Sequence, residues 1–450
     1  MKPFDKGISI DPKDILPVLK EMDSGTRIVI SEAPPGAGKT FLTAFCVANA
    51  VDRREPVLVV ANSYEQAYGL CDKIHALFPT ITPIVYANKR RRSLDFKRAF
   101  ECGFSFAVDF NDVEQAVKAG RPLVAVLRKL TVNQLKRPNA ETNELLFRWM
   151  LIDEAWQMAD ADFAIIANLA EGFVLVGDRG QIPPIVKSDI SRWKAEKDAP
   201  YRPAPEVLLS RPHLQALIAE RPMTVSRRLP QRSAEIIQRI FYPRLPFTGS
   251  LAPRRLFAGA VVDPHDNSGA VIAGCADAPP AFIPVHVPGV GRANGSDVEA
   301  LNAMGALADD LMKSKILVDG SRPLEERDIV LLVSRNQERR HLTTILRHHP
   351  GITIATANKF QGAERAISIV LHPLSGKTQT TAFDSDAGRL CVMLSRHTHA
   401  CFVIYRDGIQ EMLERSIPNA PRALGDSIDY AFAGWKANLD FARWLRESSL

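Results

Sequence analysis

The chain has 450 residues, of which 46% are hydrophobic and 24% are charged. This composition is typical of a globular protein, and the length suffices for two or three domains. No apolar run reaches the ~18–20 residues that a membrane helix needs. The start of the chain lacks the apolar core of a secretory signal, so we expect a cytoplasmic protein with no membrane partner.

The net charge is +6 and the pI is about 9.0, which favours a polyanionic partner without proving one. None of the cysteines has Cys-x-x-Cys spacing or a histidine at zinc-ligand spacing, and several lie inside apolar runs. We therefore expect reduced core cysteines rather than a zinc or disulfide framework. The cysteines are Cys46, Cys71, Cys102, Cys275, Cys391 and Cys401.

Short runs of Val, Ile and Leu alternate with longer helix-like segments, which is typical of parallel strands buried on both faces. The alternation predicts doubly wound α/β domains. The predicted strands are Arg27–Ile30, Pro56–Ala61, Met150–Asp153, Phe173–Gly177, Asp328–Val333, Ile352–Thr356, Ala366–Leu371 and Cys401–Tyr405.

A Pro-rich stretch at residues 199–205 precedes the best candidate for a domain change. We expect a first domain over residues 1–225 and a second over residues 226–450. Residues 244–295 are rich in Pro, Gly and Ala, and we expect short strands and loops there. The C-terminal end is predicted to be helical and to pack back on the body.

The strongest local signal is Ala33–Thr40, which reads Ala-Pro-Pro-Gly-Ala-Gly-Lys-Thr. It stands between an apolar run and a helix-like segment, which is the context of a P-loop, although Ala33 replaces the usual first glycine. Gly36 and Gly38 allow backbone conformations that aim N–H groups at phosphates, and the following helix N-terminus adds positive potential.

This loop predicts an ATP and Mg²⁺ site. We expect Lys39 to reach the β and γ phosphates and the Thr40 hydroxyl to ligate Mg²⁺. The residues predicted to hold the nucleotide are Pro35, Gly36, Ala37, Gly38, Lys39 and Thr40.

Two acids, Asp153 and Glu154, follow a second apolar strand. Ligands of open α/β sheets bind at the carboxyl ends of strands. An aspartate there can hold Mg²⁺, and the adjacent glutamate can polarise the water that attacks the γ-phosphate. A third strand ends in Gly177-Asp178 and is followed by Gln181, whose amide can sense a γ-phosphate or orient a water.

Taken together, these segments resemble superfamily 1 helicases. The closest likeness is to the branch of the nonsense-mediated-decay RNA helicase and its DNA-helicase relatives, which generally move 5′ to 3′. The likeness is an ordered set of motifs from about residue 28 to residue 406. The matching segments are Ala33–Thr40 for motif I, Val57–Ala67 for motif Ia, Asp153–Ala155 for motif II, Gly177–Pro184 for motif III, Thr356–Arg365 for motif V and Arg389–Arg396 for motif VI.

The resemblance implies two RecA-like P-loop domains with parallel sheets and ATP in the cleft between them. It implies that Arg228 and Arg396 approach the γ-phosphate, where a cation can accelerate transfer by about 10³–10⁵. It also implies that Gly362 and Glu364 face the nucleotide. The adenine-reading glutamine that often precedes the P-loop is missing, because residues 8–26 hold no Gln, so the choice among nucleoside triphosphates stays open.

Contacts with nucleic acid are also implied by the resemblance, at Ser63, Pro184 and Thr356. The densest basic run includes Arg91 and Arg92 and falls between motifs Ia and II, where the family often inserts an accessory element. We expect such an element at about residues 80–135. A solvated helix face is an equal alternative for this basic run.

These features predict a nucleic-acid-dependent ATP hydrolase that moves along single-stranded DNA or RNA and unwinds duplexes. The alternative is a nucleic-acid-stimulated ATPase that remodels nucleoprotein complexes without unwinding, since both would share this motor core. No zinc-rich or nuclease segment accompanies the motifs, so we expect a monomer that relies on a loading or targeting protein.

Overall fold

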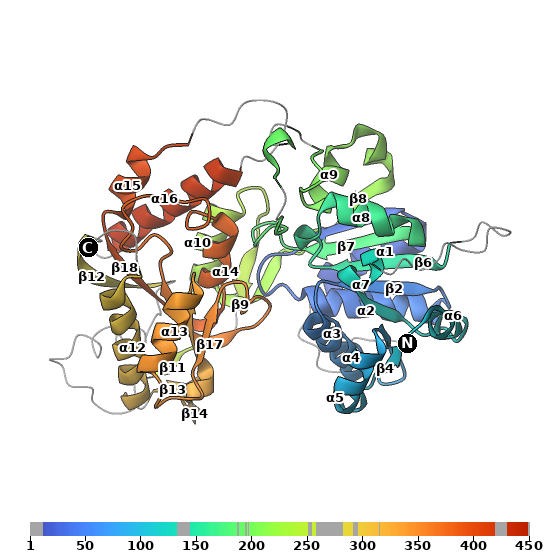
Figure 1. Cartoon of the computed structure of the whole chain (residues 1–450), viewed down its shortest axis with the longest axis horizontal. Coiled ribbons are helices and arrows are strands. Elements are labelled where there is room, and N and C mark those ends of the chain that lie inside the picture. The colour runs from blue at the N-terminus through green and yellow to red at the C-terminus, as the bar shows by residue number, and fades with distance from the viewer. Residues whose placement is uncertain are drawn as a thin grey trace.

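The computed structural model describes residues 12–132, 145–186, 189–193, 196, 198–250, 254–257, 282–290, 296–314, 316–418 and 430–448. The molecule has two lobes, each built around a parallel sheet, with the first half of the chain in one lobe and most of the second half in the other (Figure 1). This confirms the predicted α/β fold class of two RecA-like domains. In the described part of the chain, no helix is long and apolar enough to cross a membrane.

The sheet of the first lobe has eight strands in the order β4-β3-β5-β2-β6-β7-β1-β8, and all its pairings are parallel. Its strands are β1 (Ile28–Glu32), β2 (Val57–Ala61), β3 (Ile84–Tyr86), β4 (Ser105–Ala107), β5 (Leu123–Val126), β6 (Phe147–Asp153), β7 (Ala170–Gly177) and β8 (Ile218–Glu220).

Side chains of this sheet alternate between two cores, because successive residues of a strand point to opposite faces. In β2, Val57 and Val59 belong to one core, while Leu58 and Val60 belong to the other. The first core is covered by α1 (Pro12–Ser24), α2 (Lys39–Asp52), α3 (Tyr64–Leu77) and α5 (Phe96–Glu101). The second is covered by α6 (Phe110–Lys118), α7 (Leu127–Val132), α8 (Asp160–Ile166) and α9 (Ala204–Ser210).

The accessory element expected at about residues 80–135 is largely part of the main sheet. Its strands β3, β4 and β5 form one edge of that sheet, and only α4 (Lys89–Leu94) and α5 lie between β3 and β4. The last residues of the expected element, 133–135, lie outside the described residues.

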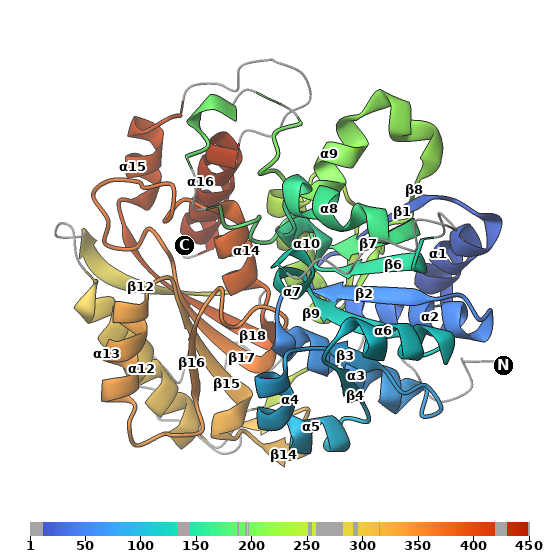
Figure 2. The same cartoon turned by 45° about the vertical axis from the view of Figure 1, so that its right-hand side comes forward.

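The sheet of the second lobe has the order β12-β18-β17-β15-β16, and its pairings are also parallel. Figure 2 shows it between α12 and α13 on one side and α14 and α16 on the other. Its strands are β12 (Ile283–Val290), β15 (Ile329–Val333), β16 (Thr353–Thr356), β17 (Arg365–Leu371) and β18 (His397–Asp407). The helices of this lobe are α10 (Gln231–Phe241), α12 (Val298–Lys313), α13 (Asn336–Ile345), α14 (Ala387–Leu394), α15 (Ile409–Arg415) and α16 (Tyr430–Ser448).

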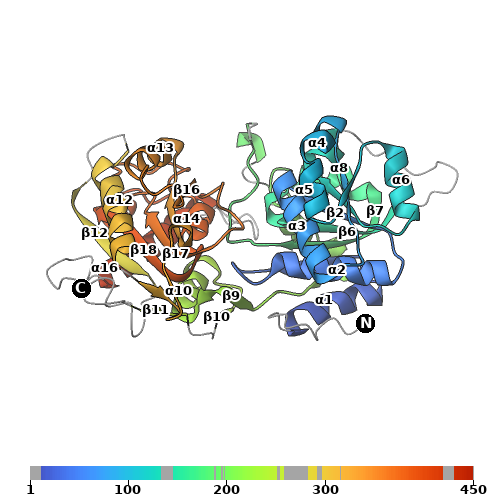
Figure 3. The ribbon, with the colours of Figure 1, turned by 90° about the horizontal axis from the view of Figure 1, so that it is seen from below.

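Two short sheets complete the described fold. Strands β9 (Val225–Pro230) and β10 (Thr248–Ser250) pair in parallel beside the connection between the lobes, as the view from below shows (Figure 3). Strands β11 (Leu256–Phe257), β13 (Leu317–Val318) and β14 (Arg322–Pro323) form an antiparallel sheet. The 3₁₀ turns are η1 (Ala155–Gln157), η2 (Ala167–Leu169), η3 (Ser191–Trp193), η4 (Pro212–Leu217) and η5 (Glu326–Asp328).

All eight predicted strands are present, as β1, β2, β6, β7, β15, β16, β17 and β18. The expected C-terminal helix is α16, whose apolar face joins the core of the second lobe. Of residues 244–295, the described parts hold β10, β11 and β12, and the rest lie outside the described residues. The first sheet ends before residue 221 and the second begins after residue 282, and we retain the division after residue 225 as a proposal. Cys46, Cys71, Cys102, Cys391 and Cys401 are free thiols, and Cys275 lies outside the described residues.

Candidate nucleotide site between the lobes

The Gly-rich loop at residues 33–38 connects β1 to α2, which begins at Lys39. Gly36 has φ 74° and Gly38 has φ 101°, both in the left-handed region that favours glycine. A Cβ on Gly36 would lie 2.2 Å from the Cβ of Arg228. Glycine is therefore required at Gly36 by its backbone conformation and by the close approach of β9.

Strand β9 holds the loop from the side of the second lobe. The Ser226 hydroxyl donates to the carbonyl of Pro35 at 2.6 Å, and the Arg227 backbone N–H donates to the carbonyl of Gly36 at 2.9 Å. The Arg227 guanidinium donates to the carbonyl of Ala37 at 2.6 Å. The loop carbonyls that would repel a phosphate are thereby occupied by donors. No sequence pattern predicted this role for Ser226, because it lies 191 positions from Pro35.

The two acids predicted from the sequence lie at the end of β6. Asp153 is buried, and its carboxylate accepts a hydrogen bond from the Glu154 backbone N–H at 3.1 Å. Glu154 has φ 57°, a conformation that costs about 1–3 kcal/mol for a residue other than glycine and that often marks a functional site. Burial raises the pKa of Asp153 to about 7, the neighbouring Glu154 charge adds to this, and Lys39 opposes it. A cation bound beside Asp153 would favour its charged form.

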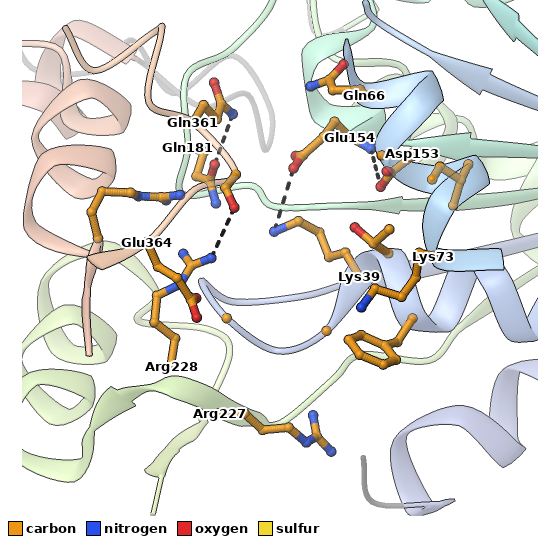
Figure 4. A pocket seen from close by; sticks show the side chains of 18 of the residues that line it. Lys39, Gln66, Lys73, Asp153, Glu154, Gln181, Arg227, Arg228, Gln361 and Glu364 are labelled. Atoms are coloured by element: carbon orange, nitrogen blue, oxygen red, sulfur yellow. Dashed lines mark hydrogen bonds and ion pairs between the residues drawn. The ribbon is translucent and has the colours of Figure 1, made fainter. Parts of the chain in front are cut away.

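Lys39 lies among carboxylates. Its Nζ atom is 3.4 Å from Asp178 Oδ2 and 4.0 Å from Glu154 Oε1. Figure 4 shows Lys39 extending from the start of α2 toward Glu154. An ammonium with three donors in this position can exchange a carboxylate partner for a phosphate oxygen.

A hydrogen-bond chain joins the lobes beside Lys39. The Gln181 amide donates to the Asp178 carboxylate, and the Gln361 amide donates to Gln181 Oε1 at 2.9 Å (Figure 4). The Tyr242 hydroxyl also donates to Asp178, and burial raises the pKa of this tyrosine well above its ordinary value. Sequence reasoning assigned no role to Tyr242 or Gln361, and it treated Asp178 only as the acid that ends a strand.

The two predicted arginines lie close together on the second side of the cavity. Arg228 donates to Glu364 at 2.5 Å and to the carbonyl of Ser395 at 3.3 Å. Arg396 is 1% exposed and donates to the carbonyl of Val392 at 2.9 Å and to the Ser395 hydroxyl at 3.0 Å. Burial, with a smaller contribution from the charge of Arg228, lowers the pKa of Arg396 to about 10. Among the described residues, no carboxylate forms an ion pair with Arg396, so its charge remains available to an anion.

These groups line one cavity of about 600 Å³ that is open to solvent. It gathers all of the predicted catalytic residues and most of the predicted nucleotide-binding residues, whereas Pro35 and Ala37 belong to the loop without lining the cavity. The predicted residues that line it are Gly36, Gly38, Lys39, Thr40, Asp153, Glu154, Gln181, Arg228, Gly362, Glu364 and Arg396. The lining residues that sequence reasoning missed are Phe41, Gln66, Gly69, Leu70, Lys73, Arg227, Arg254 and Gln361.

The donor set fits a magnesium nucleotide. Glycine conformations, a lysine and two arginines suit phosphate oxygens, and the Thr40 hydroxyl and Asp153 carboxylate are oxygen ligands of the type that Mg²⁺ prefers. Asp153 and Glu154 come from the first lobe, and Arg228 and Arg396 come from the second part of the chain. A triphosphate that contacted both sets would therefore span the two lobes.

None of the residues predicted to touch nucleic acid lines this cavity. The Ser63 hydroxyl caps α3 by accepting the Gln66 backbone N–H at 3.2 Å, although Ser63 remains exposed. Thr356 is only 7% exposed at the end of β16, so a contact with nucleic acid would need the local structure to open. Pro184 is half-buried.

The basic run lies on α4, which projects with α5 from one end of the first lobe (Figure 1). Arg91 pairs with Asp95 at 3.2 Å and lies 4.6 Å from the centroid of the Tyr64 ring, whereas Arg92 is exposed. Phe96 is 66% exposed and Phe100 is 85% exposed. Exposed aromatic rings beside arginines are the elements of a stacking surface for bases. The sequence around Phe100 did not predict that its ring is exposed, because α5 is too short for an apolar periodicity to be recognised.

Comparisons with known proteins support a nucleotide-binding domain in the first half of the chain, and they assign no function to the rest. A family model described as "AAA domain" matches residues 18–201, which is less than half of the chain. No curated protein matches the chain.

Solved structures of similar fold are helicases by title. The complex of Arterivirus nonstructural protein 10 (helicase) with DNA has 14% identity and a TM-score of 0.42, and the match covers 88% of this chain and 64% of that one. The DUF1998 helicase MrfA bound to DNA and AMPPNP has 10% identity and a TM-score of 0.46, with 90% and 52% covered. This chain thus spans less than two thirds of either relative. Similarity of this order assigns no function by itself.

Proposed function

We propose that this protein is an ATP-dependent motor that moves along single-stranded nucleic acid. The observation that carries the proposal is the cavity between the lobes, where a P-loop and an acidic pair from the first lobe face two arginines from the second part of the chain. The match of residues 18–201 to an AAA domain supports the nucleotide-binding half of the proposal. The ordered motifs that resemble superfamily 1 helicases support the nucleic-acid half.

In this proposal, Thr40 and Asp153 hold Mg²⁺ and Lys39 binds the terminal phosphates. The metal, when bound, neutralises phosphate charge. Glu154 accepts a hydrogen bond from the attacking water, since its carboxylate lies in the cavity beside Asp153. Gln181 donates to Asp178 and accepts from Gln361, so it can report a change at the phosphates to the second lobe.

Arg228 and Arg396 stabilise the charge that builds on the γ-phosphoryl oxygens. Arg228 must first loosen its pairing with Glu364, which an incoming phosphate can replace because Glu364 is half-exposed. Arg396 is held by a backbone carbonyl and a hydroxyl, so it does not have to leave a carboxylate partner before it binds a phosphate. Closure of the lobes around ATP and their release after hydrolysis would provide the alternating grip of a motor.

The test is steady-state ATP hydrolysis with and without single-stranded DNA and single-stranded RNA. The variant Lys39→Ala serves as the inactive control, which measures any hydrolysis that does not come from the proposed site. Strong stimulation by one polymer is expected and would identify the track. Turnover that ignores both polymers would contradict the motor while leaving an ATPase. Duplexes with a 5′ or a 3′ overhang then separate unwinding from protein remodelling and test the 5′-to-3′ direction, which we propose from the motif resemblance alone.

A further inference from the structure

A cluster of metal-ligand side chains lies in the second lobe, outside the nucleotide cavity. Asp309, near the end of α12, and His348 and His349, in the turn after α13, bring one ligand atom each to within 4.8 Å of one another. His348 Nε2 is 2.9 Å from Asp309 Oδ1, and His349 Nε2 is 3.2 Å from the same oxygen. The three side chains therefore converge on one point from two elements of the fold.

These distances match the edges of a tetrahedral site. A zinc ion with ligands at about 2.0–2.1 Å places any two of them about 3.3 Å apart. The two edges that meet at Asp309 Oδ1, 2.9 and 3.2 Å, need only a small adjustment of these partly exposed side chains to reach that value. Three protein ligands leave a fourth position for water, and the cluster is partly exposed, so an ion can enter.

A fourth residue fixes the orientation of one histidine. Glu326, in η5, places Oε1 2.8 Å from His349 Nδ1 and accepts the Gly351 backbone N–H with Oε2 at 2.6 Å. Both carboxylate oxygens are thus attached to the turn that carries the histidines. A metal-bound histidine commonly donates its other ring N–H to a carboxylate in this way.

The hydrogen-bond inventory also favours a cation. A carboxylate cannot donate, and His349 has a carboxylate oxygen beside each ring nitrogen. The His348 ring lies 4.5 Å from the His349 ring, and its Nε2 atom faces the same Asp309 oxygen. A divalent ion between Asp309 and the two Nε2 atoms would contact all three ligand atoms and leave His349 Nδ1 beside Glu326.

We propose that Asp309, His348 and His349 form a Zn²⁺ site, with Glu326 as the residue that orients His349. Two imidazoles and one carboxylate suit Zn²⁺, whereas Mg²⁺ prefers oxygen ligands alone. The ion would join α12 to the turn that leads into β16. It is independent of the magnesium nucleotide, so its test needs neither ATP nor nucleic acid.

The chain contains a matched control pair on the same two helices. His341 Nε2 lies 3.1 Å from Asn302 Oδ1, and both residues precede His348 and Asp309 by seven positions. An amide satisfies a neutral histidine without a cation. His341→Ala therefore removes a similar bridge between α12 and α13 without touching the cluster.

The experiment is calorimetric titration of Zn²⁺ into the untagged, metal-free, full-length chain. We expect one equivalent to bind in the wild type and in His341→Ala, and more than about 100-fold weaker binding in Asp309→Asn and His349→Ala. Glu326→Gln should weaken binding by about 10–100-fold. Zn²⁺ should raise the unfolding temperature of the wild type but not that of Asp309→Asn. Mg²⁺ should raise the unfolding temperature of neither protein.

The proposal is overturned if the wild type takes up no Zn²⁺. It is equally overturned if uptake survives unchanged in Asp309→Asn, because the ion would then lie elsewhere, for example on thiols. Circular dichroism checks the fold of each variant. Asp309→Asn and Glu326→Gln preserve side-chain shape, so the test stands even if His349→Ala fails to fold.

Discussion

The two lobes share an architecture, and both bury carboxyl groups whose pKa burial raises, including Glu338 and Asp386 in the second lobe. They differ in their histidines, because among the described residues a strong lowering of a histidine pKa by burial occurs in the second lobe. In the first lobe, burial raises the pKa of Glu32 to about 6 and of Asp153 to about 7. In the second, burial lowers the pKa of His372 and of His397 to about 3. The cause is the same in each case, because burial disfavours the charged form. The first lobe holds acids in need of a cation, whereas the second holds neutral imidazoles in its core.

The contrast continues in the cavity. The first lobe supplies Asp153 and Glu154 to the cavity, with Lys39 beside them and the buried Asp178 behind Lys39, while Arg396 comes from the second lobe. Neither lobe alone offers both the groups for the metal and the arginines for the phosphates. The nucleotide chemistry that we propose therefore needs groups from both lobes, and the following variants test each side of the cavity.

The largest effect is expected from the second lobe. Arg396→Ala should lower kcat for ATP hydrolysis by about 10³–10⁵ while nucleotide affinity changes by less than about tenfold, because the guanidinium acts mainly in the transition state. Steady-state kinetics and nucleotide titration measure the two quantities. Arg396 is buried, so Arg396→Lys serves as the control that keeps a charge there. Full kcat in Arg396→Ala would remove this residue from the catalytic set.

The matching change in the first lobe is Lys39→Ala. Lys39 lines the cavity, and its ammonium pairs with the carboxylates of Asp178 and Glu154, so the fold should stay intact while turnover falls by at least about 10²–10³. Thermal unfolding and ATP hydrolysis are measured on the same sample. Normal turnover in this variant would overturn the assignment of the nucleotide site.

Acidification should affect the stability of the two lobes in opposite directions. Below pH 6.5 the histidines of the unfolded chain become protonated, whereas His372 and His397 of the folded chain stay neutral down to about pH 3. The free energy of unfolding of the second lobe therefore falls by about 1.4 kcal/mol per pH unit for each of these histidines. Asp153 takes up a proton in the native state below about pH 7, before the unfolded chain does, so the first lobe gains stability until about pH 4. Hydrogen exchange with mass spectrometry, corrected for intrinsic rates, resolves the two lobes.

A variant isolates one histidine in this test. The Nδ1 atom of His372 accepts the Leu374 backbone N–H at 3.1 Å, and an asparagine oxygen can replace that acceptor. His372→Asn should reduce the pH slope of the second lobe by the contribution of one histidine and leave the slope of the first lobe unchanged. An unchanged slope in the second lobe would show that other groups control its acid response.

The smallest effect concerns the exposed aromatic ring of Phe100 on α5, in the first lobe. Phe100→Ala should weaken binding of single-stranded nucleic acid by about 1–3 kcal/mol, as expected for loss of one stacked base, and should leave ATP hydrolysis without nucleic acid unchanged. Fluorescence anisotropy with a labelled oligonucleotide measures the affinity. Phe257, another exposed ring but in the second lobe, provides the control variant Phe257→Ala. Equal affinities for the two variants would exclude α5 from the binding surface.

Local patterns in the sequence were sufficient for eight strands of the two main sheets and for the phosphate loop, but not for the shorter strands β3, β4, β5 and β8. Residues 28–40 specify strand, glycine turn and helix within one short segment, so Lys39 and Thr40 could be placed without knowing the fold. Asp153 was equally accessible, because the end of a buried parallel strand is where such sheets bind ligands. Buried apolar runs and glycine conformations depend on residues that are near neighbours along the chain, and those neighbours can be read directly from the sequence.

Only the tertiary structure decided which distant side chains meet. The bond from Ser226 to Pro35, the link between Gln361 and Gln181, and the zinc-type cluster join residues separated by about 40 to 190 positions. It also buried Thr356 and left Phe100 exposed, which helical or strand spacing could not distinguish. The reason is physical: backbone conformation follows from local sterics and periodicity, whereas the partner of a polar side chain depends on how whole elements pack.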